Sequence, residues 1–360
     1  MNIGIIHGFV GGGGGTEKTL HAILDALEKT DHNVTLYTFS KPKLSTYKIT
    51  INSSLPFSVP AFGLYQRAME SKLISKAKNN DVIIQASGGL SIPNNPKQKI
   101  IVYCHNDFKS ELEKTDTKYK GLWSIYYKSY YNVAKKFFKK ILDPNIFLIA
   151  NSKFVKNSIK EKYDKDSTVI FPPVDLSEFE SSTKQKIVVT VTRFSEEKNL
   201  EFALDIMKDI DVEYKIIGNT KTKSNVLYYK KLLSKLKKTN LNSRIKLLKD
   251  IERAELVKSL NTTKVYLHTS KETFGISVIE SIAAGCIPIV PDNSAHKETV
   301  PFNELRYQEN NLSDAQEKIK KAINGVFDKF LDPLRESIKI YDKNQFKKLI
   351  ISYIENLDQT

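Results

Sequence analysis

The chain has 360 residues with a formal net charge of +15, and 40% of its residues are hydrophobic. This length and composition exclude a disordered chain and suffice for two domains, while no apolar run approaches the roughly 20 residues of a membrane-spanning helix. The charge favours anionic partners or reflects only a lysine-rich composition; without a nucleic-acid-binding motif, we expect no nucleic acid.

Two features of the sequence indicate a cytoplasmic protein. Cys104 and Cys286 are the only cysteines and lie far apart, which argues against a disulfide framework and fits a reducing compartment. The N-terminus enters an apolar stretch directly, without the basic segment that opens a signal peptide.

The first part of the chain predicts a strand over residues 2–7, a run of five glycines over 11–15, and a helix that opens at Thr16. A glycine loop before a helix start forms a site for an anion or a sugar, lined by backbone groups. The candidate residues of this loop are Gly12, Gly13 and Gly14.

Two familiar glycine motifs fit this loop poorly. A phosphate loop needs Gly-Lys-Ser/Thr, but here Glu17 precedes Lys18. In the dinucleotide-binding fingerprint, Thr16 would take the place of the third glycine, and the next expected strand, 33–39, ends without an acidic residue. A tight turn that binds nothing is the remaining alternative.

Residues 40–64 are rich in Ser, Pro and Thr and predict a long irregular connection, followed by a helix at about 64–78. Strands are expected at 81–85 and 99–103, and the second delivers His105 to its C-terminal end. Ligands bind at that edge of an open α/β sheet, so His105 is a candidate functional residue, although a lone histidine is usually structural.

Apolar and aromatic residues recur at helical spacing over residues 123–141, with lysines between them. The pattern predicts a basic amphipathic helix. It could rest on an anionic membrane, which would make the protein peripheral on the cytoplasmic face. Alternatively, its apolar stripe faces the core and the lysines are solvated. Strands at 146–150 and 167–171 complete this half of the chain.

A polar segment over 176–184, which follows two prolines, predicts a linker between two runs of alternating strands and helices. We expect a first domain over 1–175, a second over 185–340, and a final helix over 341–360 that packs back on the first. The pattern predicts an α/β fold of two doubly wound Rossmann-like domains that face each other across a cleft. The strands expected in the second domain are 187–191, 212–217, 244–248, 265–269 and 287–290, with helices near 198–209, 223–238 and 252–260.

The stretch 271–290 predicts a loop with Glu272, a helix that carries Glu280 about one turn from its start, and a stop at Gly285. The amides at a helix start suit a phosphate, whereas two carboxylates suit hydroxyl groups. A nucleotide sugar has both. The amides in question belong to Phe274, Gly275 and Ile276.

Arg193 and Lys198 follow the expected strand 187–191, where they could neutralise a diphosphate. Taken alone, they would be a solvated surface pair. The Asp-x-Asp pairs at 164–166 and 209–211 are typical of a turn and a helix end, so we expect no metal site.

In combination these residues resemble the retaining GT-B glycosyltransferases of family 4. Glu272 and Glu280 match their Glu-x7-Glu motif. The five glycines and the Pro-Pro-Val-Asp segment are most similar to lipid-linked-oligosaccharide α-1,2-mannosyltransferases. The other matching segments are the loop 11–15, Tyr103-x-His105, Asn151-Ser152, Phe171-Pro-Pro-Val-Asp175, Arg193-Phe-x-x-Glu-Lys198-Asn199 and Ala284-Gly-Cys-Ile-Pro288.

The resemblance implies the GT-B fold and a role for each residue. Glu272 would bond hydroxyls of the donor sugar, and Glu280 those of the ribose. Arg193 and Lys198 would hold the diphosphate, which makes them, with Glu272 and His105, the catalytic candidates. The remaining donor-binding candidates are Thr273, Phe274, Gly275, Ile276 and the glycines of the first loop, which with His105 would close the acceptor side.

The chain departs from the family pattern at two places. Asn293-Ser-Ala295 stands where a Gly-Gly pair often lies, and Gly218-Asn219 lacks a second glycine. The resemblance therefore does not extend to the details of the sugar-binding loop or the nucleobase contacts.

We expect a retaining transferase that moves mannose or another hexose to a glycan, lipid-linked or other hydroxyl acceptor. The donor would be GDP-mannose or a UDP-hexose, with no metal or other cofactor. The alternatives are a nucleotide-sugar epimerase or phosphorylase of the same fold, and a non-catalytic protein that binds nucleotide sugar or lipid.

Overall fold

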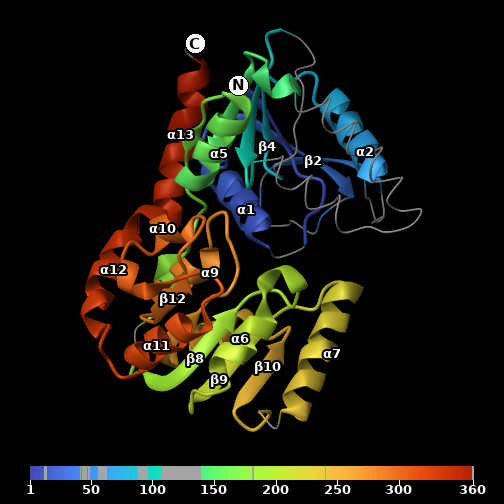
Figure 1. The fold of residues 1–360 in the computed structure, drawn as a ribbon. Coiled ribbons are helices and arrows are strands. Elements are labelled where there is room, and N and C mark those ends of the chain that lie inside the picture. Colours follow the sequence, from blue (N-terminus) through green and yellow to red (C-terminus); the bar gives the residue numbers. More distant parts are fainter. Residues whose placement is uncertain are drawn as a thin grey trace. The chain divides into compact units, whose positions relative to one another are not determined.

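A computed structural model describes residues 1–11, 14–40, 42, 47, 49–55, 63–87, 96–107, 139–180, 182–239 and 241–358. The chain divides into two compact units, each with its own sheet (Figure 1). Unit 1 is Met1–Pro173 with Lys343–Thr360, and unit 2 is Val174–Asp342. None of the helices in the described segments is long and apolar enough to span a membrane.

Unit 1 is built on a parallel sheet, seven-stranded within the described residues, in the order β3-β2-β1-β4-β5-β6-β7. Strands β2 and β3 lie on one side of β1, and β4 to β7 lie on the other. Ligands of open α/β sheets bind at the C-terminal ends of the strands at such a switch point, so we expect them at the ends of β1 and β4. The strands are β1 (Asn2–Ile6), β2 (Asn33–Ser40), β3 (Thr50–Leu55), β4 (Val82–Gln85), β5 (Lys99–Cys104), β6 (Ile146–Ala150) and β7 (Thr168–Val169).

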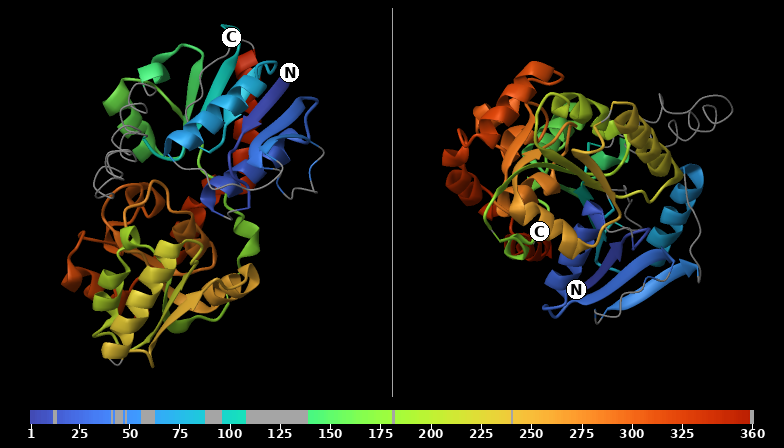
Figure 2. Two further views of the ribbon diagram at one scale, coloured as in Figure 1. Left: turned by 90° about the vertical axis from the view of Figure 1, so that its right-hand side faces the viewer. Right: turned by 90° about the horizontal axis from the view of Figure 1, so that it is seen from below.

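Helices cover both faces of this sheet, which explains why its strands are apolar on both sides. Ile100 and Val102 pack with α2 and α5, whereas their neighbours Ile101 and Tyr103 pack with α1 and α13. The C-terminal helix α13 lies against α1, so both ends of the chain contribute to unit 1 (Figure 2). The described helices are α1 (Gly15–Leu27), α2 (Gly63–Lys76), α5 (Lys153–Tyr163) and α13 (Lys343–Asp358).

One expectation for unit 1 is wrong, and another falls mostly outside the described residues. The predicted irregular connection 40–64 contains the edge strand β3, which pairs with β2 from Thr35↔Thr50 to Ser40↔Leu55. An edge strand buries less apolar surface, so its sequence lacked the pattern of a core strand. Of the predicted helix 123–141, residues 123–138 lie outside the described residues. Its end lies in a 3-10 helix, Lys139–Leu142, that buries Ile141 in the core.

Unit 2 contains a parallel sheet with the order β10-β9-β8-β11-β12-β13, six-stranded in the part of the chain that the structure describes. Its strands are β8 (Gln185–Val191), β9 (Glu213–Gly218), β10 (Ile245–Lys249), β11 (Thr263–Leu267), β12 (Ile287–Pro291) and β13 (Arg306–Tyr307). Its α-helices are α6 (Leu200–Met207), α7 (Lys223–Lys238), α8 (Arg253–Thr262), α9 (Ile276–Ala283), α10 (His296–Thr299), α11 (Leu312–Ile323) and α12 (Leu331–Ser337).

The strand–helix alternation predicted for unit 2 is confirmed, with small differences at the ends. Strand β11 stops at Leu267, two residues before the predicted end, and β13 is too short for a sequence pattern. The predicted linker 176–184 begins with a 3-10 helix, Leu176–Glu178, that is held within unit 2. Arg253 of α8 holds it there through an ion pair with Glu178 at 2.6 Å.

Strands β8 and β11 are neighbours in the sheet, with Val189 paired with Tyr266. Both run in the same direction, so their C-terminal ends meet at one edge. The order of the sheet also reverses here, between β8 and β11. The loops that follow these two strands carry Lys198 and Glu272, respectively, and the fold therefore brings the two residues together.

Candidate functional site

The central feature of unit 2 is the loop between β11 and α9. Gly275 is the N-cap residue of α9 and has φ +94°, a left-handed conformation that side chains disfavour. Its carbonyl accepts a hydrogen bond from the Val278 amide at 3.0 Å. Gly285 ends the helix with φ +83°. The two glycines fix a short helix whose first amides have no intrahelical partner.

Glu272 lies in this loop, and one of its carboxylate oxygens is heavily used. Oε1 lies 2.5 Å from Lys198 Nζ, 3.0 Å from His268 Nε2 and 3.2 Å from Ser270 Oγ. The second oxygen, Oε2, has no hydrogen-bond partner among the described residues. About 20% of the side chain is exposed. The carboxylate thus has one fixed oxygen and one that a ligand can reach.

Glu272 is held in its ionised form. Burial disfavours the charge and raises the pKa of the carboxyl, but the His268 hydrogen bond and the Lys198 charge outweigh it. The pKa therefore lies well below its usual range. An ionised carboxylate only accepts hydrogen bonds, so its partner must be a donor such as a hydroxyl group.

Glu280, the second glutamate of the motif, is buried in α9 and lies in an ion pair that the sequence did not predict. Arg253 Nη2 lies 2.9 Å from Glu280 Oε1. The same guanidinium donates from Nε and Nη2 to the two oxygens of Glu178, at 2.8 and 2.6 Å. Arg253 thus links α8, α9 and the start of unit 2.

Arg193 and Lys198 occupy the loop after β8, but in different surroundings. Arg193 is 59% exposed and forms a surface ion pair with Glu197 at 3.2 Å. Lys198 is mostly buried against Glu272, and its carbonyl accepts a hydrogen bond from the Thr269 hydroxyl. The structure therefore brings Lys198 and Glu272 into contact and leaves Arg193 in solvent.

The Phe274 side chain belongs to the core. Its buried ring packs edge-on against Tyr341, with centroids 5.1 Å apart. Thr273, Gly275 and Ile276 are partly exposed on either side of it. Any contact of Phe274 with a ligand would come from its backbone, as the sequence interpretation assumed.

In unit 1, His105 follows β5 at the C-terminal edge of the sheet. Its Nε2 lies 3.0 Å from the Ala86 carbonyl, which follows β4. Part of the side chain reaches the surface, but the ring is deep enough that desolvation lowers its pKa to about 4. The imidazole is therefore neutral at physiological pH.

The glycine loop is described at its ends, while Gly12 and Gly13 lie outside the described residues. Gly14 is the N-cap residue of α1. Gly11 has φ +114°, and its amide donates to Glu17 Oε1 at 2.6 Å. Glu17, which argued against a phosphate loop, thus reaches back from the first turn of α1 to hold the loop.

Two histidines at the strand ends escaped the sequence interpretation. His268 was assigned to the apolar strand 265–269, although it follows the end of β11 and contacts Glu272. His7 follows β1, is 4% exposed, and has no hydrogen bond to either ring nitrogen from the described residues. Burial lowers its pKa. A polar residue just past an apolar strand was the available signal for both.

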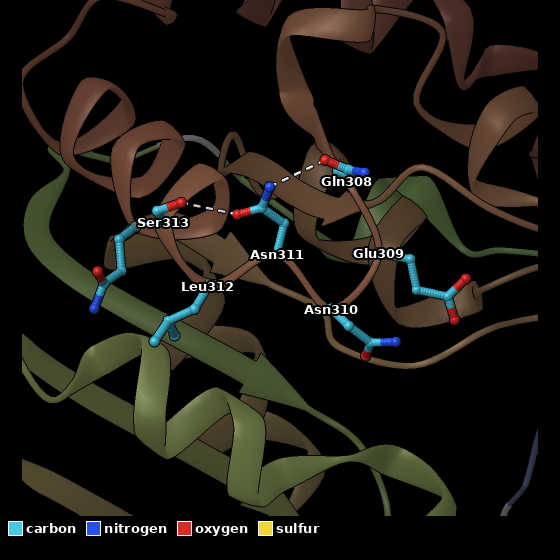
Figure 3. Close-up of a pocket in the computed structure, with 7 residues that line it drawn as sticks. Gln308, Glu309, Asn310, Asn311, Leu312 and Ser313 are labelled. Atoms are coloured by element: carbon cyan, nitrogen blue, oxygen red, sulfur yellow. Dashed lines mark hydrogen bonds between the residues drawn. The ribbon is translucent and has the colours of Figure 1, made fainter.

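A second polar feature of unit 2 is an open hollow at the turn between β13 and α11 (Figure 3). Asn311 caps α11 and hydrogen-bonds to Gln308 and Ser313, so these side chains satisfy one another. Lys271 forms an ion pair with Glu309 at 3.3 Å on the side of the Glu272 loop. The polar side chains that line the hollow therefore belong to the N-terminal cap of α11.

The Asp-x-Asp pairs have structural surroundings: Asp209 accepts from Gln316 at 3.5 Å, and Asp211 lies 4.0 Å from Arg244. Asp164 is the C-cap residue of α5 and pairs with Lys160 at 2.8 Å. Within the described residues, no group of three or more His, Cys, Asp or Glu side chains is arranged to hold a metal ion.

Two family models match consecutive parts of the chain. "Glycosyltransferase Family 4" matches residues 13–178, and "Glycosyl transferases group 1" matches residues 175–345. The first covers unit 1 from α1 onward, without β1 and α13, and the second covers unit 2 with the Glu272 loop. The two models together account for nearly the whole chain.

Individual proteins agree with these matches. The "GDP-Man:Man(3)GlcNAc(2)-PP-Dol alpha-1,2-mannosyltransferase" of Dictyostelium discoideum is 20% identical over 278 residues, 69% of this chain and 54% of the relative. Aligned parts cover 53% to 58% of the curated relatives, so the chain spans about half their length.

Solved structures share the fold over the whole chain. The sucrose-phosphate synthase of Thermosynechococcus elongatus superposes with a TM-score of 0.83 at 15% identity, covering 99% of both chains. The Anabaena protein Alr3699/HepE, solved in complex with UDP-glucose, has a TM-score of 0.72 at 15% identity, covering 99% of this chain and 100% of its own. Two parallel-sheet units and two family models that together match residues 13–345 place the chain in glycosyltransferase family 4, with the GT-B fold.

Proposed function

We propose that the protein is a retaining hexosyltransferase that uses a nucleoside diphosphate sugar and a hydroxyl acceptor. The observation that carries the proposal is the contact between Lys198 and Glu272 at the switch point of the unit 2 sheet. A cation and a carboxylate with one open oxygen match a ligand that combines a diphosphate with sugar hydroxyls.

GDP-mannose is the first donor we propose, because the Dictyostelium relative is named for it. A UDP-hexose is the second, because Alr3699/HepE was solved with UDP-glucose. A glycan or lipid-linked glycan is the proposed acceptor, again from the name of the Dictyostelium relative.

Each residue receives a role that its surroundings support. Glu272 Oε2 would accept a hydrogen bond from a donor-sugar hydroxyl. Lys198 would direct its remaining N–H groups to the diphosphate, and the exposed Arg193 would turn from Glu197 to join it. Glu280 would accept from the ribose hydroxyls beside Arg253. The amides of residues 274–276 and Thr273 would line the sugar and phosphates.

On unit 1, we propose that the acceptor binds at the edge that carries His105 and the glycine loop. The neutral imidazole of His105 has one nitrogen at the Ala86 carbonyl and can offer the other to a hydroxyl group. Such a contact orients the acceptor without adding a charge.

The proposed chemistry breaks the bond between the sugar C1 and the diphosphate oxygen, and its electron pair goes to the leaving diphosphate. Lys198 and Arg193 stabilise the negative charge that develops there, without a bound metal. The acceptor oxygen bonds to C1 on the face that the diphosphate leaves, which gives retention. The acceptor proton passes to the departing phosphate oxygen, the nearest base on that face.

The first test is a screen of GDP- and UDP-sugars for thermal stabilisation, since a ligand of the folded state raises its melting temperature by mass action. Positive donors are then incubated with glycan and lipid-linked acceptors, with and without EDTA, and the product anomer is determined by NMR. Retained configuration and activity in EDTA support the proposal. Inverted product, or dependence on a divalent ion, contradicts it.

The same assay separates the alternatives. An epimerase isomerises the donor without an acceptor, and a phosphorylase needs inorganic phosphate. A binding protein is stabilised by the nucleotide sugar but turns over none.

We also propose a peripheral position on an anionic membrane, supported by the net charge of +15 and the basic, aromatic sequence of 123–141. Co-sedimentation with phosphatidylserine vesicles at low salt tests it. Protein that stays in the supernatant contradicts the proposal.

A further inference from the structure

A chain of buried polar groups runs behind Glu272 into the sheet of unit 2. His268, which is buried, contacts Glu272 Oε1 through Nε2 and the Tyr266 hydroxyl through Nδ1, at 3.0 and 3.2 Å. The Tyr266 hydroxyl lies 2.8 Å from Ser277 Oγ in α9. It also lies 3.2 Å from the Val191 carbonyl at the end of β8. The chain thus joins both strands that carry the proposed donor site.

The proton on His268 follows from its partners. Because Glu272 is ionised and can only accept, the imidazole nitrogen that faces it must carry the hydrogen. Nδ1 faces the Tyr266 hydroxyl, whose single proton can be donated to only one of its three neighbours, Nδ1, the Val191 carbonyl and Ser277 Oγ. Glu272 thus fixes the hydrogen on Nε2, and the Tyr266 hydroxyl supports the ring from the Nδ1 side.

The backbone of His268 is fixed as firmly as its ring. Its amide donates to the Ile289 carbonyl of β12 at 2.9 Å, and its carbonyl accepts from the Tyr307 hydroxyl of β13 at 2.8 Å. The ring packs edge-on against His296, with centroids 5.1 Å apart. The imidazole therefore has a defined direction, and Glu272 receives a hydrogen bond from a rigid donor.

We propose that His268 is a positioning residue that sets the orientation of Glu272. Its Nε2–H holds Oε1 beside Lys198 and turns Oε2 alone toward the ligand. The proposal rests on the proposed function, because the groups it orients are those assigned to the sugar and the diphosphate. One consequence is that losing His268 misplaces the sugar hydroxyl and Lys198 together, while the nucleotide contacts of Glu280 remain.

The kinetic test compares variants of His268 and Tyr266. His268→Leu is expected to lower kcat by about 10- to 100-fold, because a reacting group misplaced by about 1 Å costs a factor of this size. The Kd of the nucleoside diphosphate alone should change less than about twofold. His268→Gln keeps an N–H donor toward Glu272 and should recover part of the loss. Tyr266→Phe should lower kcat by a smaller factor, on the order of tenfold.

Tyr214→Phe is the matched control for Tyr266→Phe. Tyr214 is equally buried in the same sheet, and its hydroxyl bonds to Thr190 Oγ1 at 2.7 Å, away from Glu272. A purely structural role predicts equal losses in the two Phe variants and no recovery in His268→Gln. That outcome overturns the proposal, as does a wild-type kcat in His268→Leu. If His268→Leu does not fold, His268→Gln and the two Phe variants decide.

A measurement without substrate separates this inference from the proposed function. The chain has six histidines, and the His268 signals in a nitrogen-15 imidazole spectrum can be assigned by their loss in His268→Gln. We expect a hydrogen on Nε2 at neutral pH both in the wild type and in Tyr266→Phe, because Glu272 faces this nitrogen in both. A wild-type Nδ1–H tautomer refutes the positioning role, whatever the protein transfers. The expected tautomer with no nucleotide-sugar binding refutes the proposed function alone.

Discussion

Both units have candidate residues at the C-terminal edge of a parallel sheet, but these residues differ in the number of hydrogen bonds they form. In unit 2, Glu272 Oε1 has three close partners, and His268 behind it is bonded on both ring nitrogens. In unit 1, His105 has one ring hydrogen bond, and His7 has none from the described residues. A saturated network fixes its groups before a ligand arrives, whereas a sparse one is completed by the ligand or by water.

This difference suits two kinds of substrate. A donor with a diphosphate presents the same charges in every reaction, so fixed counter-charges can be placed in advance. An acceptor hydroxyl is neutral and needs only a hydrogen bond. The comparison predicts that substitutions in unit 2 act on the reacting donor and those in unit 1 on the use of the acceptor.

The largest effect is expected from Lys198→Ala. Loss of the cation should lower transfer by about 10²- to 10³-fold, because the leaving diphosphate loses charge stabilisation. The control is Lys231→Ala, which removes an exposed ion pair with Glu201 of similar length, 2.7 Å. Both variants should retain the wild-type circular dichroism spectrum. Transfer near the wild-type rate in Lys198→Ala would refute the mechanism.

His105→Asn is expected to lower transfer by about 10- to 100-fold, the scale of a misplaced acceptor, without changing the affinity for the nucleotide sugar. The asparagine cannot reach the positions of both imidazole nitrogens. His32→Asn, before β2 at the opposite end of the sheet, is the control. Isothermal titration and a steady-state assay with varied acceptor measure the two effects. Equal losses of donor affinity and transfer would remove the functional distinction between the units.

Gly218→Ala tests whether the close approach of the loop after β8 to Gly218 is required. A Cβ at Gly218 would overlap the Thr192 carbonyl, so the backbone before Arg193 would shift. We expect a loss of about 1–3 kcal/mol of stability and a higher KM for the donor. Gly14 has open space around its Cβ position and φ −91°, so Gly14→Ala should leave the unfolding midpoint nearly unchanged. Equal midpoints for both variants would argue against this close approach.

The smallest effect concerns the pH dependence of stability through His296 in unit 2. Burial lowers the pKa of His296 to about 3, and its Nε2 bonds to the Ser270 carbonyl. The unfolded chain takes up a proton below about pH 6.5, whereas the folded chain does not. Stability should therefore fall as the pH drops from 6.5 toward 3, by about 2 kcal/mol between pH 7 and 4.5.

His296→Gln removes this group and should make the decline shallower. Urea unfolding at pH 7 and pH 4.5 measures the difference between wild type and variant. An unchanged slope would show that His296 is protonated in the folded state.

The sequence predicted the parts of the fold that depend on local patterns. Apolar runs located the core strands, and α7 has the predicted bounds of 223–238. Strands β3 and β13 were not predicted, because β3 has a mostly polar sequence and β13 has only two residues. The helix predicted for 123–141 stays a prediction over 123–138, and its last residues lie in a 3-10 helix, Lys139–Leu142, in which Ile141 is buried.

The candidate site was likewise predicted only where it depends on local patterns. Glu272, Gly275 and Glu280 could be located because strand, loop and helix follow one another in the sequence. The contact of His268 with Glu272 was not predicted, because an apolar run with one histidine has the pattern of a strand. The ion pair of Arg253 with Glu280 joins α8 to α9 across the intervening strand β11, and no local pattern encodes it.

The sequence alone therefore determined most of the order of core strands and helices and the approximate strand ends, since apolar periodicity, helix caps and glycines act over a few neighbours. Only the tertiary structure decided which ends meet. Parallel pairing of β8 with β11 placed Lys198 against Glu272, 2.5 Å apart and both largely buried. It also put His268 behind the carboxylate, because a side chain's partners depend on packing between segments that are distant in sequence.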